Sequence, residues 1–245
     1  MNVDPSVQRR LLELAEVDAE LSRNDHRRAT LPELAEIAEV EKSLRAGKDS
    51  LVAVQTSASD LDREVIRQER EVESVRAREG KDRTLMDSGS VSAKQLTDLE
   101  HELHSLQRRQ SALEDDLLEL MEQREAVGMD EQRTAAEVDA CEQKLADAQR
   151  RRDEVFADLD TTQMRREADR AALAPLFPAE LLARYERVRA SRGIGAGLLR
   201  ARRCGACQLE FDRSTLSEIR SAAADAVVSC ENCGAILIRT EESGL

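Results

Sequence analysis

Four of the five cysteines in the sequence occur as two Cys-x-x-Cys pairs near the C-terminal end. The pairs are Cys204 with Cys207 and Cys230 with Cys233, and 22 residues separate them. Each pair can place two thiolates on one ion from a tight turn, and four thiolates at about 2.3 Å form a closed tetrahedral zinc site. No position is left for water, so we predict one structural Zn²⁺ and no metal catalysis. Iron and a redox-active dithiol are the alternatives, although a thioredoxin-like site has a single pair in an α/β sheet.

The segments that must position these cysteines are short. Gly205 and Gly234 follow a cysteine of each pair and ease the turns. Short strands are expected around the metal, with a helix over 214–223 in which Thr215 and Glu218 have capping-box spacing. A unit of this size has little apolar core, so we expect zinc binding to be coupled to its folding.

A heptad pattern over Leu96–Leu159 dominates the middle of the chain. Apolar residues recur at alternating steps of three and four, and the positions between them are mostly charged or Gln. This spacing predicts one helix of about 95 Å with a narrow apolar seam, at 1.5 Å per residue. Because such a seam needs a partner helix, the rest of the chain has to supply one. Cys141 falls on the seam and is expected to be a small buried residue.

The partner is predicted upstream, where a second seam begins at Ile37 and runs to Val75. An earlier helix begins at Pro5 with Asp4 as its N-cap, and Pro32 predicts an interruption near 29–32. Residues 87–90 are typical of a turn, and Ser92 to Gln95 fits a capping box, so an antiparallel hairpin is expected.

The pairing of the two seams can also be predicted. With the turn centred on Gly89, Gln68 lies opposite Gln110 and Ile37 opposite Cys141, whereas a slip of one heptad would place Gln68 beside Leu103. The first register is preferred because it lets the two buried amides face each other. Before the interruption the phase shifts by two residues, which is expected to bring Val17 opposite Leu159 and Leu21 opposite Val155.

The predicted fold class is therefore mainly α, a long antiparallel coiled-coil hairpin with a small C-terminal β-rich zinc ribbon. We expect the hairpin over 1–174, with a kink near 29–32 and a tip near 86–92. A short helix and a flexible Gly-rich connector are expected over 175–199, and the C4 ribbon over 200–245.

Composition agrees with a coiled coil, since aromatic residues make up 2% of the chain and charged residues 36%. The net charge is −13, but the segment from Arg184 onward has ten arginines against eight acidic residues. Only the C-terminal part could therefore bind nucleic acid through charge. No apolar run approaches membrane-spanning length, no signal peptide is expected at the N-terminus, and the cysteine usage predicts a reducing cytoplasm.

Seven arginines crowd the approach to the first cysteine pair and are candidate contacts for nucleic acid or another partner. They are Arg184, Arg187, Arg189, Arg192, Arg200, Arg202 and Arg203. One hypothesis is a phosphate-binding patch, because guanidinium groups suit phosphate. The other is that these arginines dock the ribbon onto the acidic hairpin. Base-specific RNA recognition has little support, since only Phe211 is available in the ribbon for stacking.

The hairpin tip is a second candidate contact, with Asp82 and Asp87 near the turn. In outline it is similar to transcription factors that insert an acidic coiled-coil tip into the secondary channel of RNA polymerase. The simpler interpretation is that both acids are solvated.

The sequence resembles the bacterial C4-type zinc-ribbon coiled-coil family. The features that resemble it are the acidic helical hairpin, the turn Asp-Ser-Gly-Ser-Val-Ser-Ala-Lys-Gln-Leu, the Gly-rich connector, and the CGAC and CENCGAIL motifs. The resemblance covers essentially the whole chain and implies that Cys204, Cys207, Cys230 and Cys233 are the metal ligands. It also implies an adaptor or chaperone role, with RNA, RNA polymerase or a sigma factor among the partners. Relatives commonly have Arg-Ile-Leu-Tyr where this chain has Ala-Ile-Leu-Ile at 235–238.

No nucleophile–base pair, phosphate loop or carboxylate constellation is present in the sequence, so we predict that the protein is not an enzyme. The main hypothesis is a cytoplasmic zinc-ribbon adaptor that contacts RNA, DNA or the transcription machinery. The alternative is a protein–protein scaffold or chaperone that works through the hairpin. The sequence leaves the oligomeric state open.

Overall fold

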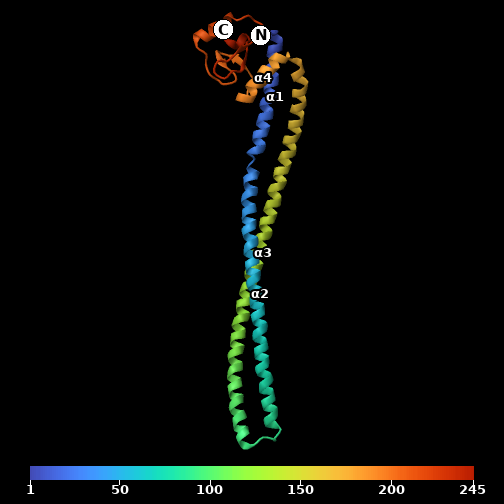
Figure 1. Cartoon of the computed structure of the whole chain (residues 1–245), viewed down its shortest axis with the longest axis vertical. Coiled ribbons are helices and arrows are strands. Elements are labelled where there is room, and N and C mark those ends of the chain that lie inside the picture. The colour runs from blue at the N-terminus through green and yellow to red at the C-terminus, as the bar shows by residue number, and fades with distance from the viewer. The chain divides into compact units, whose positions relative to one another are not determined.

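The computed structural model describes residues 1–245 and is mainly helical with a small C-terminal sheet, which confirms the predicted fold class (Figure 1). The α-helices are α1 (Pro5–Ala29), α2 (Pro32–Asp87), α3 (Ala93–Leu173), α4 (Ala179–Arg192) and α5 (Arg213–Ser221). The strands are β1 (Ala196–Arg200), β2 (Arg203–Cys204), β3 (Val228–Ser229) and β4 (Ile236–Ile238). The chain also has two 3-10 turns, η1 (Ala174–Leu176) and η2 (Glu241–Ser243). None of the helices combines the length and the apolar character needed to cross a membrane.

The chain forms two compact units. One unit consists of residues 1–34 and 150–245, and the other of residues 35–149. The ribbon does not form a unit by itself, because its sheet shares an apolar core with α1 and α4. Tertiary packing thus unites the first helix with the C-terminal segment, which sequence patterns treat as distant.

In the unit of residues 35–149, α2 and α3 run antiparallel and are joined by the loop at 88–92 (Figure 1). The predicted capping box at the start of α3 is present. The backbone N–H of Ser92 donates to Oε1 of Gln95 at 2.9 Å, and the backbone N–H of Gln95 approaches Oγ of Ser92 at 3.4 Å. These contacts satisfy orphan donors at the helix terminus and so define where α3 begins.

The predicted register of this hairpin is wrong by one heptad. A methyl group added at Gly47 would lie 3.3 Å from Cγ2 of Val138, whereas the predicted register places Gly47 opposite Glu131. Farther along, Nε2 of Gln68 donates to the backbone oxygen of Leu113 at 3.2 Å. A helical carbonyl oxygen points toward the residue four positions later, so Gln68 is level with residue 117 and not with residue 110.

The two seam glutamines explain why the prediction failed. Gln68 finds a main-chain acceptor across the seam, and Gln110 donates to the carboxylate of Glu114 on its own helix at 2.8 Å. Each amide is satisfied without the other, so the cost of an unpaired buried amide does not select the register. Another polar seam residue, Arg124, reaches out of the seam to Asp62 at 2.6 Å.

In the other unit, α1 starts as predicted, because the Asp4 carboxylate accepts the backbone N–H of Ser6 at 2.8 Å and Pro5 occupies the first helical position. The predicted pairing of Val17 with Leu159 is wrong by at least one heptad. Nδ2 of Asn24 donates to the backbone oxygen of Leu159 at 3.0 Å, so Leu159 lies opposite a residue at least seven positions later on α1 than expected.

The sheet of the ribbon has the order β2-β1-β4-β3, in which β1 and β4 are parallel and the other pairs antiparallel. The N-terminal residues extend it, since Asn2 forms a bridge with Ala226 and the backbone N–H of Val3 donates to Asp225 at 2.7 Å. Nε2 of Gln8 then donates to the backbone oxygens of both Val3 and Asp225. The start of α1 is thereby fastened to the ribbon.

The glycine-rich segment is built into the core and is not the predicted flexible connector. Gly193 caps α4 with φ 84°, a left-handed geometry that favours glycine. A Cβ at Gly195 would lie 2.5 Å from the ring of Tyr185, and one at Gly197 would lie 2.6 Å from the backbone nitrogen of Ala206. The absent side chains let β1 approach α4 and the first cysteine turn closely.

Candidate metal centre

The first cysteine pair is held by a tight turn that follows β2. The backbone N–H of Gln208 donates to the carbonyl of Cys204 at 2.8 Å, and Gln208 adopts φ 62°. The backbone N–H of Gly205 donates to Leu198 at 2.9 Å, and a Cβ at Gly205 would lie 2.6 Å from that same oxygen. Glycine is therefore required here by close packing against β1.

The second pair repeats this geometry between β3 and β4. The backbone N–H of Gly234 donates to the carbonyl of Cys230 at 2.8 Å with φ 76°, in the position that corresponds to Gln208. The backbone N–H of Cys230 donates to Ala235 at 2.8 Å, which closes the turn against the start of β4. The two turns present their thiols toward each other from opposite sides of one site.

The sulfur positions fit a tetrahedral zinc ion. The Sγ atoms of Cys204 and Cys233 are 3.8 Å apart, as are those of Cys207 and Cys230, and all four lie within 4.8 Å of one another. A tetrahedron with Zn–S arms of about 2.3 Å has edges of about 3.8 Å. All four ligands are sulfur, so the group they would hold is one structural Zn²⁺, and its role is to crosslink the two turns.

The surroundings of the sulfurs couple metal binding to protonation. Burial raises the pKa of the Cys204 thiol to about 12, and burial also raises the pKa of Cys233. Zinc binds thiolates, so the ion has to displace these protons and its affinity increases with pH. The cysteine side chains are packed with a small apolar cluster that contains Leu199, Phe211 and Leu237. Zinc therefore completes a core that is too small to be stable by itself.

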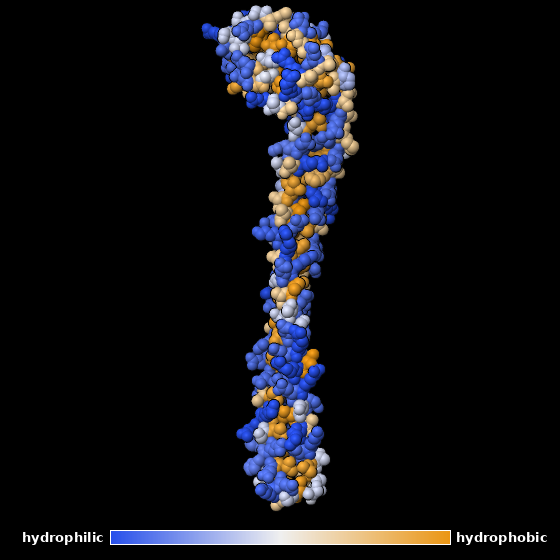
Figure 2. Space-filling view, in the orientation of Figure 1, coloured by the Kyte–Doolittle hydropathy of each residue, from blue (hydrophilic) through white to orange (hydrophobic).

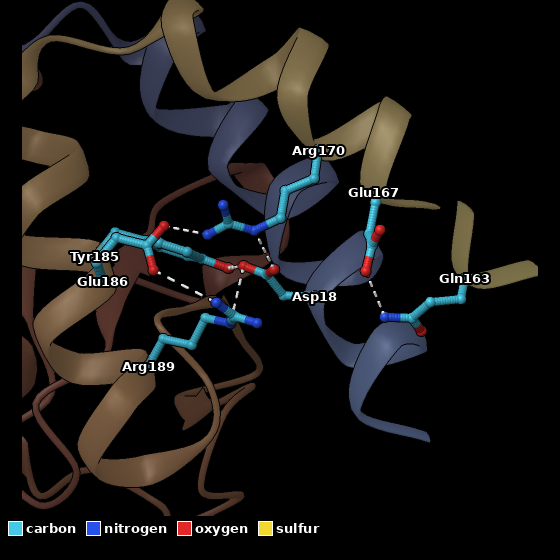
Figure 3. Close-up of polar contacts among 7 residues, drawn as sticks. All are labelled: Asp18, Gln163, Glu167, Arg170, Tyr185, Glu186 and Arg189. Carbon is cyan, nitrogen blue, oxygen red and sulfur yellow. Dashed lines mark hydrogen bonds and ion pairs between the residues drawn. The ribbon is translucent and has the colours of Figure 1, made fainter. Parts of the chain in front are cut away.

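The buried carboxylate of Asp18 on α1 contacts residues of α3 and of α4, the helix that precedes the ribbon. Asp18 is 2% exposed and accepts the hydroxyl of Tyr185 at 2.7 Å (Figure 3). Nε of Arg170 lies 2.7 Å and Nε of Arg189 3.2 Å from the same carboxylate, and Glu186 bridges both guanidinium groups. Burial, and secondarily Asp18, raise the pKa of Tyr185 above its ordinary range.

This network was not predicted, although the sequence contains a signal for it. Asp18 stands four residues after Leu14 and three before Leu21, on the apolar seam of α1. A charge at a seam position requires a partner, but the two arginines and the tyrosine come from residues more than 150 positions away. Only the packing of α1 against α3 and α4 brings them together.

Comparison with known proteins agrees with this architecture. A family model described as the CT398-like coiled coil hairpin domain matches residues 14–193, and one described as the C4-type zinc ribbon domain matches residues 203–237. The chain belongs to the CT398-like coiled-coil hairpin family with a C4-type zinc ribbon. It is thus a zinc-ribbon coiled-coil protein.

Several relatives are similar over nearly their full length. A protein of Mycobacterium tuberculosis is 44% identical over 98% of both chains, and one of Mycobacterium leprae is 38% identical over 91% of this chain and 96% of its own. A solved structure from Mycobacterium smegmatis has a TM-score of 0.88 at 42% identity and covers 98% of this chain and 100% of that one. The CT398 structure from Chlamydia trachomatis covers 95% and 97% with a TM-score of 0.70 at 15% identity, which shows a shared fold.

The seven candidate arginines of this family member have different surroundings and do not form one set. Arg189 is used internally by Asp18, and Arg184 donates to Oγ of Ser229 on β3 at 2.9 Å. Arg200 pairs with Glu242 at 3.1 Å and Arg203 with Glu210 at 3.6 Å, and both acids belong to the ribbon. The remaining three are exposed and form no ion pair within the chain; they are Arg187, Arg192 and Arg202.

Arg239 is a further residue that the sequence did not single out. Its guanidinium group donates to the backbone oxygens of Ile219 and Ala222 near the end of α5, and to those of Ala223, Ala224 and Ala226. One side chain thus donates to five carbonyls at and after the C-terminal end of α5, where helical carbonyls lack partners within the helix. Arg239 therefore orders the segment that leads from α5 to β3 and the second cysteine pair.

The two acids predicted at the hairpin tip are not equivalent. Asp82 is 5% exposed and lies on the seam of α2, where Nε of Arg78 approaches its carboxylate at 3.4 Å. Asp87 is the last residue of α2 and is exposed. The tip therefore presents Asp87 but not Asp82, because the heptad spacing that continues from Val72 and Val75 turns Asp82 inward.

Proposed function

We propose that the protein is an adaptor whose ribbon binds the phosphate backbone of nucleic acid through the turn between β1 and β2. The observation that carries this proposal is the exposure of Arg202 and its lack of an ion-pair partner. Its guanidinium group is exposed and has no carboxylate partner, in a chain with a net charge of −13. Where the arginines of this turn form ion pairs, their partners are acids of the ribbon itself, Glu242 for Arg200 and Glu210 for Arg203.

The geometry of the turn supports a binding role. Ala201 and Arg202 have φ of 46° and 64°, a left-handed region that non-glycine residues rarely adopt. The backbone N–H groups of these residues donate to the carbonyls of Glu242 at 3.0 Å and Ser243 at 3.1 Å. Backbone strain that is held in place by neighbouring structure concentrates at functional sites. Here it keeps Arg202 at the apex, flanked by Arg200 and Arg203.

The adjacent ion pairs would not prevent binding. In the pair of Arg203 with Glu210, the side chains are 61% and 60% exposed, so the contact is solvated and weak. A phosphate accepts a bidentate guanidinium contact and can replace a solvated carboxylate. Binding to phosphates alone is independent of sequence, which suits a ribbon with few aromatic side chains for base stacking.

Salt-dependent binding tests this proposal. Labelled single-stranded RNA and duplex DNA are titrated at several salt concentrations with the wild type, with Arg202→Ala/Arg203→Ala, and with Arg67→Ala/Arg70→Ala on α2 as the control. Removing one arginine–phosphate contact lowers the salt slope by about one unit, so the slope should fall by about two in the ribbon variant and stay unchanged in the control. No binding at low salt by the wild type, or equal weakening in both variants, would refute the proposal.

The alternative is a protein–protein scaffold that works through the hairpin, with RNA polymerase or a sigma factor as the protein partner. Exposed apolar side chains along the hairpin favour this role, among them Leu118 and Met121 on α3 at 59% and 50% exposure. If nucleic acid does not bind, crosslinked capture with the intact chain, compared with Asp87→Lys at the tip, tests whether such a partner is held by the tip. A cytoplasmic location is part of the proposal, because four of the five cysteines form a metal site and do not form a disulfide framework.

A further inference from the structure

A line of exposed residues runs along α2 at intervals of seven. It consists of Arg45, Val52, Ser59, Ile66 and Glu73, and we call it the α2 stripe. All five are exposed, with Val52 at 62% and Ile66 at 46%. Heptad spacing keeps them on one side of a supercoiled helix over about 42 Å, at 1.5 Å per residue.

The α2 stripe is distinct from the seam that packs on α3. The seam residues Ala58 and Val72 are 4% and 3% exposed, and each stands one position before a member of the stripe. Successive helical residues differ by about 100° in direction, so the stripe lies to the side of the seam, and the exposure of its residues shows that α3 does not cover it. Figure 2 shows apolar residues reaching the surface at several places on the part of the molecule formed by α2 and α3.

The charged ends of the α2 stripe have no partners in the chain. Arg45 and Glu73 form no ion pair, in contrast to nearby charges that bridge α2 and α3. Those bridges are Lys48 with Glu142 at 2.7 Å and Arg76 with Glu114 at 2.6 Å. The unpaired charges are of opposite sign and lie at opposite ends of a central part that consists of two apolar side chains and one small serine.

The α2 stripe is therefore self-complementary when reversed. We propose that it is the interface through which two copies of this chain pair, with their α2 helices antiparallel. A two-fold axis at Ser59 sets Ser59 against its own copy, Val52 against Ile66 of the second copy, and Arg45 against Glu73 of the second copy. Each charge pair and each apolar pair then occurs twice, as an isologous contact requires. The small side chain of Ser59 at the crossing point allows the two backbones to approach, and the two hydroxyls can hydrogen-bond to each other.

Residues of α3 widen the contact. Leu118 and Met121 follow Glu114 by four and seven residues and so share its side of α3, which faces Arg76 of α2. They add apolar surface on the side of the hairpin that carries Ile66, where Val52 of the second copy is placed. The charge of −13 per chain opposes association, so the two charge pairs supply orientation and lower the repulsion at the contact.

Charge reversal tests the interface directly. The oligomeric state of the full chain is measured by sedimentation equilibrium over a range of concentrations and salt. Arg45→Glu and Glu73→Arg should each weaken dimerisation by about tenfold or more, because each change places like charges together at two sites. The double variant restores both pairs and should return to within about threefold of the wild type. Arg67→Glu, an exposed arginine about 100° around the helix from the α2 stripe, should weaken dimerisation by less than about twofold.

A crosslink tests the two-fold axis. With Cys141→Ser as background, Ser59→Cys should form a disulfide-linked dimer under mild oxidation, because each Cys faces its own copy across the axis. Ser57→Cys, which is exposed elsewhere on α2, should not. Neither residue touches the metal ligands, so zinc content serves as the check on folding.

Each outcome decides the proposal. A dimer that weakens in both single variants, recovers in the double variant and crosslinks through position 59 supports it. A chain that remains monomeric at every concentration overturns it and leaves the exposed face to a different protein. A dimer that is insensitive to charge reversal also overturns it, since the copies would then meet through another surface.

Discussion

Substitution of Asp18 by Ala removes the acceptor shared by Tyr185, Arg170 and Arg189. Removing one partner of a buried ion pair costs about 3–5 kcal/mol because the remaining charge is left uncompensated. The arginine side chains are 26% and 29% exposed, so water can partly solvate them, whereas Tyr185 is fully buried. We therefore expect a loss near the lower end, about 3 kcal/mol. The smaller change Asp18→Asn keeps the shape and one acceptor, and should cost about 1–2 kcal/mol.

The affected unit has about 130 residues, namely 1–34 and 150–245. For a unit of this size, 1 kcal/mol shifts the melting temperature by about 3–5 °C, so Asp18→Ala should lower it by about 10 °C. The chain has one tyrosine and no tryptophan, so intrinsic fluorescence reports Tyr185 alone, whereas far-UV circular dichroism reports all helices. The fluorescence transition should move by this amount. Asp25→Ala, an exposed acid on the same helix, is the control.

Alkaline pH provides an independent test of the same contact. The pKa of Tyr185 is raised in the folded chain, chiefly by burial. Above about pH 10 the unfolded chain releases the phenol proton while the folded chain keeps it, so stability falls as pH rises. The decline should be smaller in Tyr185→Phe, with unfolding of both proteins followed by far-UV circular dichroism because the variant has no tyrosine. An unchanged fluorescence transition in Asp18→Ala, together with equal alkaline slopes for wild type and Tyr185→Phe, would contradict the structural role assigned to the network.

Other expected outcomes concern the metal, the glycines and the register. The wild type should contain one zinc per chain, and Cys207→Ser should lose it while most of the helical circular dichroism signal remains. Zinc retained in this variant would argue against the four-sulfur site. In denaturant titration, Gly195→Ala should lower the free energy of unfolding by about 1–3 kcal/mol, because the added methyl group collides with the ring of Tyr185. Gly80→Ala lies in open space within α2 and should raise the free energy of unfolding by about 0.5–1 kcal/mol. Gly47→Cys/Val138→Cys should form an intrachain disulfide, and failure to do so would count against the observed register.

Local chemistry made much of this protein predictable from its sequence. Two Cys-x-x-Cys pairs specify four sulfur ligands regardless of what surrounds them, because each pair forms its own turn. The heptad seams predicted two long helices, and the Asp4 cap and the box at Ser92 with Gln95 lie where the sequence places them. These features depend on residues a few positions apart, so a linear pattern contains them fully.

The features that only the tertiary structure decided are those in which the energy comes from distant segments. A heptad repeat is nearly satisfied by a shift of seven residues, so the seams alone could not choose the register once Gln68 and Gln110 had other partners. The joining of the N-terminal residues to the ribbon depends on backbone hydrogen bonds such as that of Val3 with Asp225, which no side-chain pattern encodes. Arg189 was a candidate for binding nucleic acid, but it forms an ion pair with Asp18 because α1 packs against α4. Sequence determined which groups were available, and packing determined which of them remained free to bind.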